Sequence, residues 1–509
     1  MTRRGFVLVL DIGTTGARAM LFDAAGQVGG FAYEEYQSLH RAPNVIDHDP
    51  VTWLDAVART VPAALAAARV DGEDVAAVVV TSQRATVMPV DAAGQPLAPA
   101  VLWQDKRTRP QCERLAAVIG EEEVYRRTGL RIDPYFSLPK LMWFAEAHPD
   151  VYRAAYRFVT VHDLVVHHLT GVFATEYTQA SRTMLLDVAR LAWDEDLARA
   201  AGLPGVPLPE DVRPTGSVAG ALTEAAAAQL GLRPGTPVVM AGGDQQCAAV
   251  GLGVVAPGLV KVTTGTGSFV VAPVAQPVFD PARRVLLSAS ALPGQWILEA
   301  GIFTTGAVLR WFRDQLGHAE VEAAQAAGAD AYDLLTAEAA EAEPGAGGLV
   351  WLPHFAGSAA PHWDPEARGV VYGLTLAHTR KDLARAVLEG IAMEIGMNLA
   401  VMRTLVGGRL AEVRVSGGMV RSELFNQIQA DVYGCAVVPG RLEQATALGA
   451  AALAWTAVGV YPDAAEAARR MGGLDEPRRR QPDAGRHAFY RDRMRLHAAV
   501  YRALAAYAR

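Results

Sequence analysis

The chain has 509 residues, of which 51% are hydrophobic and 20% are charged, and its formal net charge is −7. This length and apolar content predict roughly two to four domains with sizeable cores, and they exclude wholesale disorder and a disulfide-stapled scaffold. A protein with this net negative charge has no overall positive potential that would attract the phosphate backbone of a nucleic acid, so a nucleic-acid partner is disfavoured. None of the four lysines follows a glycine, which excludes a Walker-type phosphate loop.

Cysteine usage and the apolar runs favour a cytoplasmic protein with no membrane partner. Cys112, Cys247 and Cys435 are far apart and lack metal-ligand spacing, which indicates buried thiols in a reducing compartment. The first apolar run ends at Asp11 and is too short for a signal peptide. The uncharged stretch 445–462 is mostly small residues, so it predicts a buried helix rather than a membrane span.

Strand-like and helix-like segments alternate along the chain. A strand at 6–10 and another at 17–22 come first, with a turn at 23–26 before a third. Later strands are predicted at 75–80, 237–240, 259–262, 269–272 and 413–415. A helix over 379–405 begins with the capping-box spacing of Thr379 and Asp382. This alternation predicts an α/β protein with mixed sheets.

Two Gly/Thr-rich loops, one in each half of the chain, connect pairs of strands. The first runs from Asp11 to Gly16 and the second from Thr263 to Ser268. The backbone N–H groups and hydroxyls of such loops can surround phosphate oxygens. The first loop alone fits an ordinary tight turn equally well, but the second favours a phosphate clamp. Two similar units predict two related domains, with a boundary near residues 250–258.

Three strand ends carry residues with candidate chemistry. Asp11 is well placed to hold Mg²⁺ through water, because this hard ion prefers carboxylate oxygens and bound water. Asp244 follows the strand at 237–240, where it could accept or orient the proton of an attacking hydroxyl, although a helix N-cap explains it as well. The turn at 416–422 leads from a strand into a helix, so it is either an adenine, ribose or phosphate contact or a plain connection.

Taken together and in order, these motifs resemble the FGGY family of carbohydrate kinases over nearly the whole chain. Segments similar to its two phosphate loops, its catalytic segment and its two longer signatures lie at 10–16, 264–269, 243–246, 135–144 and 369–390. The resemblance implies an α/β fold of two actin-like (RNase H-like) ATPase domains flanking a deep cleft. Residues 1–253 would bind the sugar or polyol, and residues 254–509 would bind the nucleotide and include a terminal helix.

The resemblance also implies a reaction and a set of site residues. ATP would donate its γ-phosphoryl group to a hydroxyl of a small polyol or sugar, with Asp244 as the catalytic residue and Mg²⁺ at Asp11 and Asp244. The substrate-binding residues would be Arg84, Trp103, Tyr135, Asp244, Gln245 and Phe269. The ATP-binding residues would be Gly13, Thr14, Thr15, Arg18, Gly265, Thr266, Gly306, Arg310, Gly418 and Ser422.

Within the family, the segments at 103–108, 176–185 and 361–369 are similar to those of the glycerol kinases, with two departures. Ala85 follows Arg84 where those proteins have a glutamate, so a carboxylate for substrate hydroxyls is missing and a longer polyol or sugar is expected. Glycerol stays the alternative acceptor. Arg310 replaces a glutamine on the adenine side.

Two further questions stay open at this level. A non-catalytic actin-like nucleotide-binding regulator would share the two-domain ATP cleft, and it is the alternative from a different functional class. A homodimer or a higher homo-oligomer is compatible with the sequence, which contains no feature that decides the oligomeric state.

Overall fold

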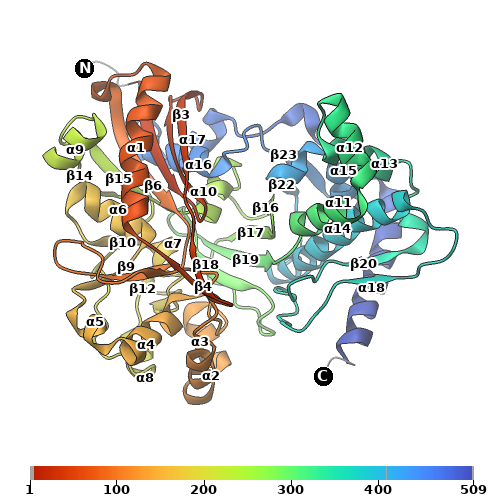
Figure 1. The fold of residues 1–509 in the computed structure, drawn as a ribbon, viewed down its shortest axis with the longest axis horizontal. Helices are drawn as coiled ribbons and strands as arrows, with labels where there is room; N and C mark the ends of the chain where they lie inside the picture. Colours follow the sequence, from red (N-terminus) through yellow and green to blue (C-terminus); the bar gives the residue numbers. More distant parts are fainter. Residues whose placement is uncertain (1–4, 409, 507–509) are drawn as a thin grey trace.

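The computed structural model describes residues 5–408 and 410–506, which form two sheet-centred lobes (Figure 1). The first lobe is built on a six-stranded sheet in the order β14-β15-β6-β1-β2-β3. Its strands are β1 (Phe6–Ile12), β2 (Gly16–Phe22), β3 (Val28–Glu35), β6 (Val75–Ser82), β14 (Val218–Ala221) and β15 (Pro237–Gly243). Strand β1 pairs antiparallel with β2 and parallel with β6, and β6 pairs parallel with β15.

The second lobe repeats five strands of this topology in a sheet of order β18-β19-β17-β16-β22-β23, with its sixth strand, β18, at the opposite edge. Its strands are β16 (Leu259–Thr264), β17 (Ser268–Val274), β18 (Leu286–Ala289), β19 (Trp296–Ile302), β22 (Glu412–Ser416) and β23 (Ala436–Pro439). Strand β16 pairs antiparallel with β17 and parallel with β22, as β1 does with β2 and β6. The predicted relationship between the two halves is therefore confirmed, and every predicted strand is present.

Helices cover both faces of each sheet. The larger ones are α1 (Val51–Ala68), α6 (Val161–Thr170), α9 (Glu224–Leu230), α10 (Asp244–Gly251), α11 (Gly306–Leu316), α14 (Arg380–Leu405), α15 (Glu423–Tyr433), α16 (Ala445–Ala457), α17 (Ala464–Met471) and α18 (Ala484–Ala505). The predicted long helix is α14, and Thr379 N donates to Asp382 Oδ2 over 2.8 Å at its start. The capping-box prediction is thus confirmed.

Insertions surround these two cores. In the first lobe they are β4 (Leu39–Ala42), β5 (Val45–His48), β7 (Val87–Val90), β8 (Ala100–Val101), β9 (Arg157–Thr160), β10 (Ala174–Glu176), β11 (Leu186–Asp187), β12 (Ala192–Trp193), β13 (Asp211–Arg213), α2 (Arg109–Val118), α3 (Glu121–Thr128), α4 (Ser137–Ala147), α5 (Pro149–Ala154), α7 (Tyr177–Ala180) and α8 (Glu195–Ala200). In the second they are α12 (His318–Ala327), α13 (Ala331–Ala340), β20 (Val350–Leu352) and β21 (Val370–Tyr372).

One helix of each half packs against the sheet of the other half. Helix α16 belongs to the second half but covers the face of the first sheet that carries Val7, Val9 and Val79; Figure 1 shows it in blue beside the red and orange strands. Helix α10 packs against Val271 and Ile297 of the second sheet. This exchange places the start of α10, with Asp244, between the lobes. The boundary after residue 253 stays a prediction.

The two exchanged helices cross at a contact between glycines. A Cβ atom on Gly449 would lie 1.8 Å from the carbonyl oxygen of Cys247, and one on Gly251 would lie 2.0 Å from that of Ala445. Any larger side chain would push the helix backbones apart. Glycine is therefore required on both helices for this close approach.

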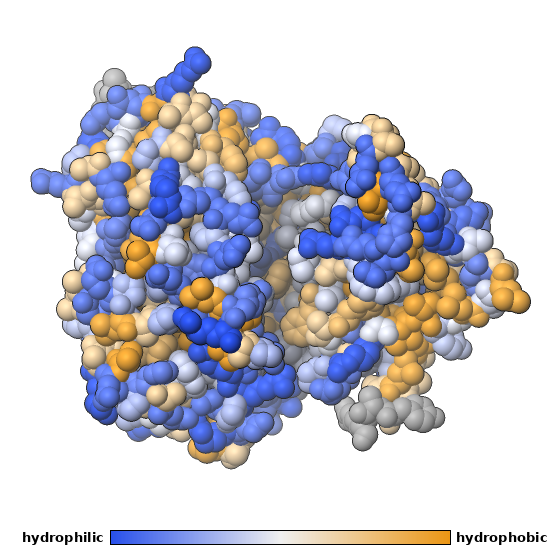
Figure 2. All heavy atoms as spheres, in the orientation of Figure 1, coloured by the Kyte–Doolittle hydropathy of each residue, from blue (hydrophilic) through white to orange (hydrophobic). Residues whose placement is uncertain are grey.

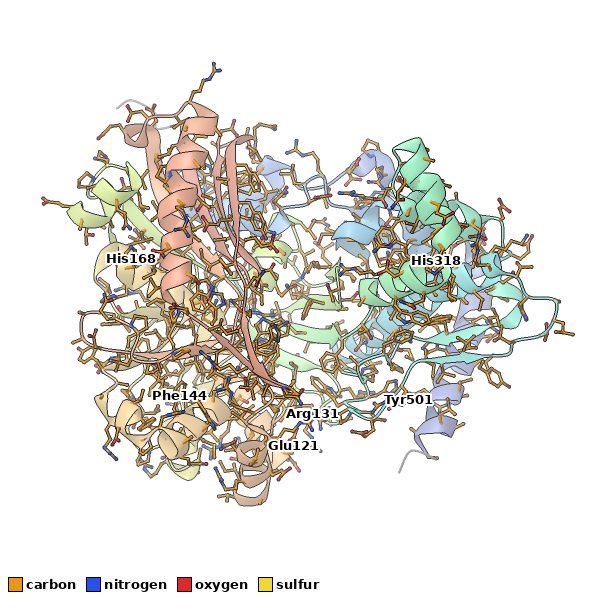
Figure 3. The ribbon with its side chains drawn as sticks, viewed as in Figure 1. Glu121, Arg131, Phe144, His168, His318 and Tyr501 are labelled. Carbon is orange, nitrogen blue, oxygen red and sulfur yellow. The ribbon has the colours of Figure 1, made fainter. Side chains whose placement is uncertain are left out.

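A second connection joins the lobes at the far end of α3. Leu287 N donates to Gly129 O over 2.9 Å, and the hydroxyl of Tyr125 donates to Val285 O over 2.8 Å. Figure 3 shows Arg131 beside Glu121 at this edge of the first lobe, and the guanidinium of Arg131 lies 5.4 Å from the ring centroid of Trp363. The two lobes are separated elsewhere by a furrow, which Figure 2 shows between them.

The predictions about cysteines and membrane spans can be compared with this fold. Cys112, Cys247 and Cys435 are all free and buried, as expected. The stretch 445–462 contains the buried helix α16, also as expected. Within residues 5–408 and 410–506, no helix has both the length and the apolarity that crossing a membrane requires.

Candidate active site

Asp244 lies where β15 ends and α10 begins, and it is held by three polar contacts. Its Oδ1 accepts a hydrogen bond from Gln245 N over 2.7 Å and lies 3.4 Å from the Nε of Arg84. Its Oδ2 accepts from Gln245 Nε2 over 3.3 Å. The side chain remains 34% exposed, so the carboxylate can still meet a ligand. The N-cap of α10 is Gly243, not Asp244, so the capping alternative is wrong.

Arg84 is oriented by a buried carboxylate from the other lobe. Its Nη1 donates to both oxygens of Glu299, at 3.1 and 2.9 Å, and Arg182 donates to the same carboxylate. Gln246 Nε2 adds a contact of 3.3 Å. Burial alone would raise the pKa of Glu299, but the charges of Arg182 and Arg84 outweigh it and hold the pKa at about 2. This ionised cluster fixes the arginine that faces Asp244.

Sequence reasoning missed Glu299 and Arg182 as members of the site. A signal for Glu299 exists, because it is a lone charge in the otherwise apolar strand β19. A charged residue in a buried strand needs a partner, so it marks a place where another segment must supply opposite charge. Arg182 lies in the segment 176–185, whose likeness to glycerol kinases assigns no role to this arginine.

An aromatic wall adjoins the carboxylate. The rings of Trp103 and Tyr135 have centroids 5.4 Å apart, and Trp103 Nε1 donates to the hydroxyl of Thr14 over 2.9 Å. The ammonium of buried Lys140 donates to Tyr135 O at 2.7 Å and to Ala85 O at 2.8 Å. The wall is therefore tied to the first Gly/Thr-rich loop and to the segment that carries Arg84.

The small side chain of Ala85 does not leave open space beside Arg84. It is only 1% exposed, and its backbone has a φ of 64°. The residue therefore packs against its surroundings in this conformation, so extra room for a longer substrate is not visible there.

The first loop is a tight hairpin with a carboxylate at its base. Gly13 N donates to Gly16 O over 3.0 Å, and Gly13 O accepts from the hydroxyl of Tyr36 over 2.7 Å. Asp11 is 8% exposed, and its Oδ2 lies 3.5 Å from Nη1 of Arg18. Burial raises the pKa of Asp11 to about 6; Arg18 opposes this shift, and the negative charge of Asp244 adds to it.

The two acidic side chains have the chemistry of a Mg²⁺ site that also uses water and phosphate oxygens. Asp11 and Asp244 are close enough for each charge to act on the other, so a cation between them would relieve repulsion. In the part of the chain that the structure describes, no cluster of three or more His, Cys, Asp or Glu side chains forms an all-protein metal cage. Mg²⁺ suits this arrangement because it commonly keeps several waters.

The predicted nucleotide residues of the second lobe gather around its hairpin. Gly306 N donates to Gly265 O over 3.0 Å at the start of α11, and Thr266 O accepts from Thr305 N over 3.0 Å. A Cβ on Gly417 would lie 2.3 Å from the carbonyl oxygen of Thr264, so the third Gly-rich turn packs directly on this hairpin. Three segments far apart in sequence thus meet at this hairpin.

Other predicted residues are less closely joined to these groups. Ser422 caps α15 by accepting from Phe425 N over 3.2 Å, and the neighbouring Gly418 is exposed. Arg310 is exposed on α11 and has no polar partner among the described residues. Phe269 lies over Gly301 within the second sheet, and no described contact joins it to Asp244.

Comparisons with known proteins agree on both halves of the chain. Residues 6–251 match the family model of the N-terminal domain of the FGGY family of carbohydrate kinases, and residues 260–458 match that of its C-terminal domain. Similar proteins include a glycerol kinase of Gloeobacter violaceus, 39% identical over 489 residues (94% of this chain and 93% of that one). A glycerol kinase of Bordetella parapertussis is 36% identical over 479 residues (91% and 90%).

Solved structures show the same fold. A xylulose kinase from Rhodospirillum rubrum has a TM-score of 0.90 and 28% identity, and the match covers 99% of both chains. A Plasmodium falciparum glycerol kinase with ADP has a TM-score of 0.86 and 22% identity, and the match covers 97% of this chain and 98% of that one. The fold prediction of two actin-like ATPase domains is confirmed.

Proposed function

We propose that this chain, a member of the FGGY family of carbohydrate kinases, phosphorylates a small polyol or sugar held against Asp244. Members of this family are ATP-dependent phosphotransferases that act on a hydroxyl group. The observation that carries the assignment of the site is the partly exposed Asp244 carboxylate beside the buried Arg84–Glu299 pair. The comparisons give no support to the non-catalytic regulator. The small-molecule substrate follows from the family, whereas its identity is part of the proposal.

In the proposed reaction, Asp244 acts as the general base. Its Oδ2 has room to accept the proton of the substrate hydroxyl, because Gln245 occupies only one direction around it. The hydroxyl oxygen forms a bond to the γ-phosphorus as the bond to the β–γ bridging oxygen breaks and ADP leaves. Arg84 orients another substrate oxygen, and Trp103 and Tyr135 pack against the C–H face.

The phosphates of ATP are proposed to lie between the two hairpins. Hairpin residues Gly13, Thr14, Thr15, Gly265 and Thr266, together with Arg18, would supply N–H, hydroxyl and guanidinium donors. The proposed nucleoside contacts are Gly306, Arg310, Gly418 and Ser422. Asp11 and Asp244 would hold Mg²⁺, which supplies neutralisation of the phosphate charge. A cytoplasmic location, where ATP is available and thiols stay reduced, is proposed as well.

Two acceptors compete within this proposal. The absence of a carboxylate at Ala85 favours a polyol or ketose longer than glycerol, because a site with fewer acceptors recognises a different set of hydroxyls. Glycerol is the second candidate, and the 36–39% identity to two glycerol kinases over more than 90% of the chain favours it. Phe269 is retained as a proposed pocket residue in either case.

A substrate panel tests the proposed function. Purified protein with ATP and Mg²⁺ should release ADP in response to at least one member of a set of polyols, ketoses and aldoses, measured in a coupled assay. Binding of ATP without turnover of any member would contradict the proposal. The rank order of kcat/KM separates glycerol from longer acceptors.

Ala85→Glu is expected to raise kcat/KM for glycerol relative to longer substrates by roughly tenfold, because it restores a carboxylate next to Arg84. The measurement is the ratio of the two kcat/KM values. Ala85→Gln is the matched control, since it adds nearly the same volume without the charge. A ratio that stays at the wild-type value in Ala85→Glu would mean that position 85 does not set the preference.

A further inference from the structure

A buried lysine from the second lobe reaches the catalytic segment. Lys261 lies on β16 and is 0% exposed, and its ammonium donates to Oε1 of Gln245, the residue after Asp244. It points to the face of the second sheet that α10 covers, since neighbouring Val260 and Val262 belong to the core on the opposite face. No carboxylate lies within ion-pair distance of it among residues 5–408 and 410–506. The mechanism above assigns it no role.

The contact with Lys261 decides which way the amide of Gln245 faces. In its protonated form the amino group can only donate, and it then meets the amide oxygen rather than the amide nitrogen. The nitrogen is then turned toward Asp244, and Nε2 lies 3.3 Å from Oδ2. Without the lysine, only the long hydrogen bond to Asp244 would favour this orientation of the amide.

The orientation matters because of what Asp244 must still do. Its Oδ1 is occupied by Gln245 N and faces Arg84, so Oδ2 is the oxygen that remains open for a substrate proton. An amide N–H₂ beside this oxygen has a second hydrogen that can point to the oxygen of the same substrate hydroxyl. The hydroxyl would donate to Asp244 and accept from Gln245, which fixes it for attack.

Burying a lysine without an acidic partner is unfavourable. Burial lowers the pKa of Lys261 to about 7, with Asp244 acting in the opposite direction. Costly buried groups of this kind are concentrated at functional sites. Strand β16, which carries Lys261, ends in the hairpin proposed to hold the phosphates of ATP. The same strand would therefore contact ATP and help to orient the acceptor.

We propose that Lys261 is a positioning residue of the acceptor site, which holds the amide of Gln245 so that its N–H₂ group faces Asp244 and the substrate hydroxyl. This inference rests on the proposed function, because it specifies how that site orients its acceptor. Lys261 touches neither substrate, and it acts through Gln245.

A double-mutant cycle tests the proposal. Lys261→Met should lower kcat/KM for the acceptor roughly tenfold and leave the KM for ATP near its wild-type value. In a Gln245→Ala background, the same substitution should change kcat/KM less than twofold, since the group through which Lys261 acts is gone. Equal losses in both backgrounds would overturn the proposal.

The neighbouring strand offers a matched control. Arg414 pairs with Lys261 in the sheet register, and its Nη1 donates to Leu252 O and Gly253 O at the other end of α10. Arg414→Met therefore removes a link between the same sheet and the same helix, away from Asp244. Arg414→Met should lower the unfolding temperature without lowering kcat/KM for the acceptor. An equal acceptor-specific loss in this variant would mean that any loosening of α10 suffices.

Two further measurements keep the test decisive if Lys261→Met folds poorly or no acceptor is found. Gln245→Glu keeps a partner for Lys261 but removes the N–H₂ group, so kcat/KM for the acceptor should fall although the protein folds; wild-type kcat/KM would overturn the proposal. Neutron crystal structures of wild type and Lys261→Met, which distinguish the oxygen of the Gln245 amide from its nitrogen, need no turnover. An unchanged amide orientation would refute Lys261 alone, whereas an inactive wild type refutes the proposed function.

Discussion

Asp244→Asn should lower kcat by about 10²- to 10⁴-fold, the range by which a positioned general base accelerates proton transfer. Asparagine has the same size and can keep the contact with Gln245, but its amide cannot accept a proton from the substrate. Acceptor-stimulated ADP release at saturating ATP measures the effect. The KM for ATP should also rise, because Asp244 is proposed to help hold the Mg²⁺ that accompanies the phosphates, so kcat is compared at saturating ATP and Mg²⁺.

The unfolding temperature of Asp244→Asn is the control for this experiment. Asp244 is 34% exposed at its side chain, so the stability of the fold should not depend strongly on its charge. If the variant keeps at least a tenth of wild-type kcat, a different group removes the proton and Asp244 has only an orienting role.

Glu299→Gln should destabilise the protein by about 3 kcal/mol near neutral pH, because it removes the carboxylate that two buried arginines share. The lowering of the pKa of Glu299 on folding, which the charges of Arg182 and Arg84 cause, has the sign that such a loss requires. The measurement is urea unfolding, in which the midpoint should fall while the slope of the free energy of unfolding against urea concentration stays constant. The KM for the acceptor should also rise, since Arg84 loses its support.

The pH dependence of this effect has a defined sign. A carboxyl group whose pKa is lowered on folding contributes stability above its unfolded pKa, and this contribution is lost as the pH falls toward the folded value. The wild-type protein should therefore lose stability between about pH 4.5 and pH 2 more steeply than Glu299→Gln. If the free energy of unfolding of wild type and of Glu299→Gln changed in parallel between these pH values, the cluster around Glu299 would not be the cause of the acid sensitivity.

Glu123 provides a matched surface control. It also pairs with two arginines, Arg126 and Arg127, and its pKa is lowered to about 2 by the hydrogen bonds from them. Its side chain is 35% exposed, so solvent screens these charges. Glu123→Gln should therefore change the urea midpoint far less than Glu299→Gln does.

Local patterns predicted the strands, both hairpins and the position of Asp244, because each depends on residues close together in sequence. The sequence also indicated a buried helix in 445–462, but not which sheet covers it, since its apolar residues fit either one. Glu299, Arg182 and Lys261 were missed for a related reason. Their partners come from other segments or the opposite lobe, and such pairing is decided by tertiary placement rather than by any local motif.

The exchange of α10 and α16 makes the protein less modular than its repeated architecture suggests. Cutting the polypeptide after residue 253 would strip α16 and α17 from the first sheet and expose the apolar stripe around Val7, Val9 and Val79 to water. Neither fragment would contain every segment that its own core requires. Evolution or engineering can therefore not shuffle the halves independently unless residues 445–471 travel with the first.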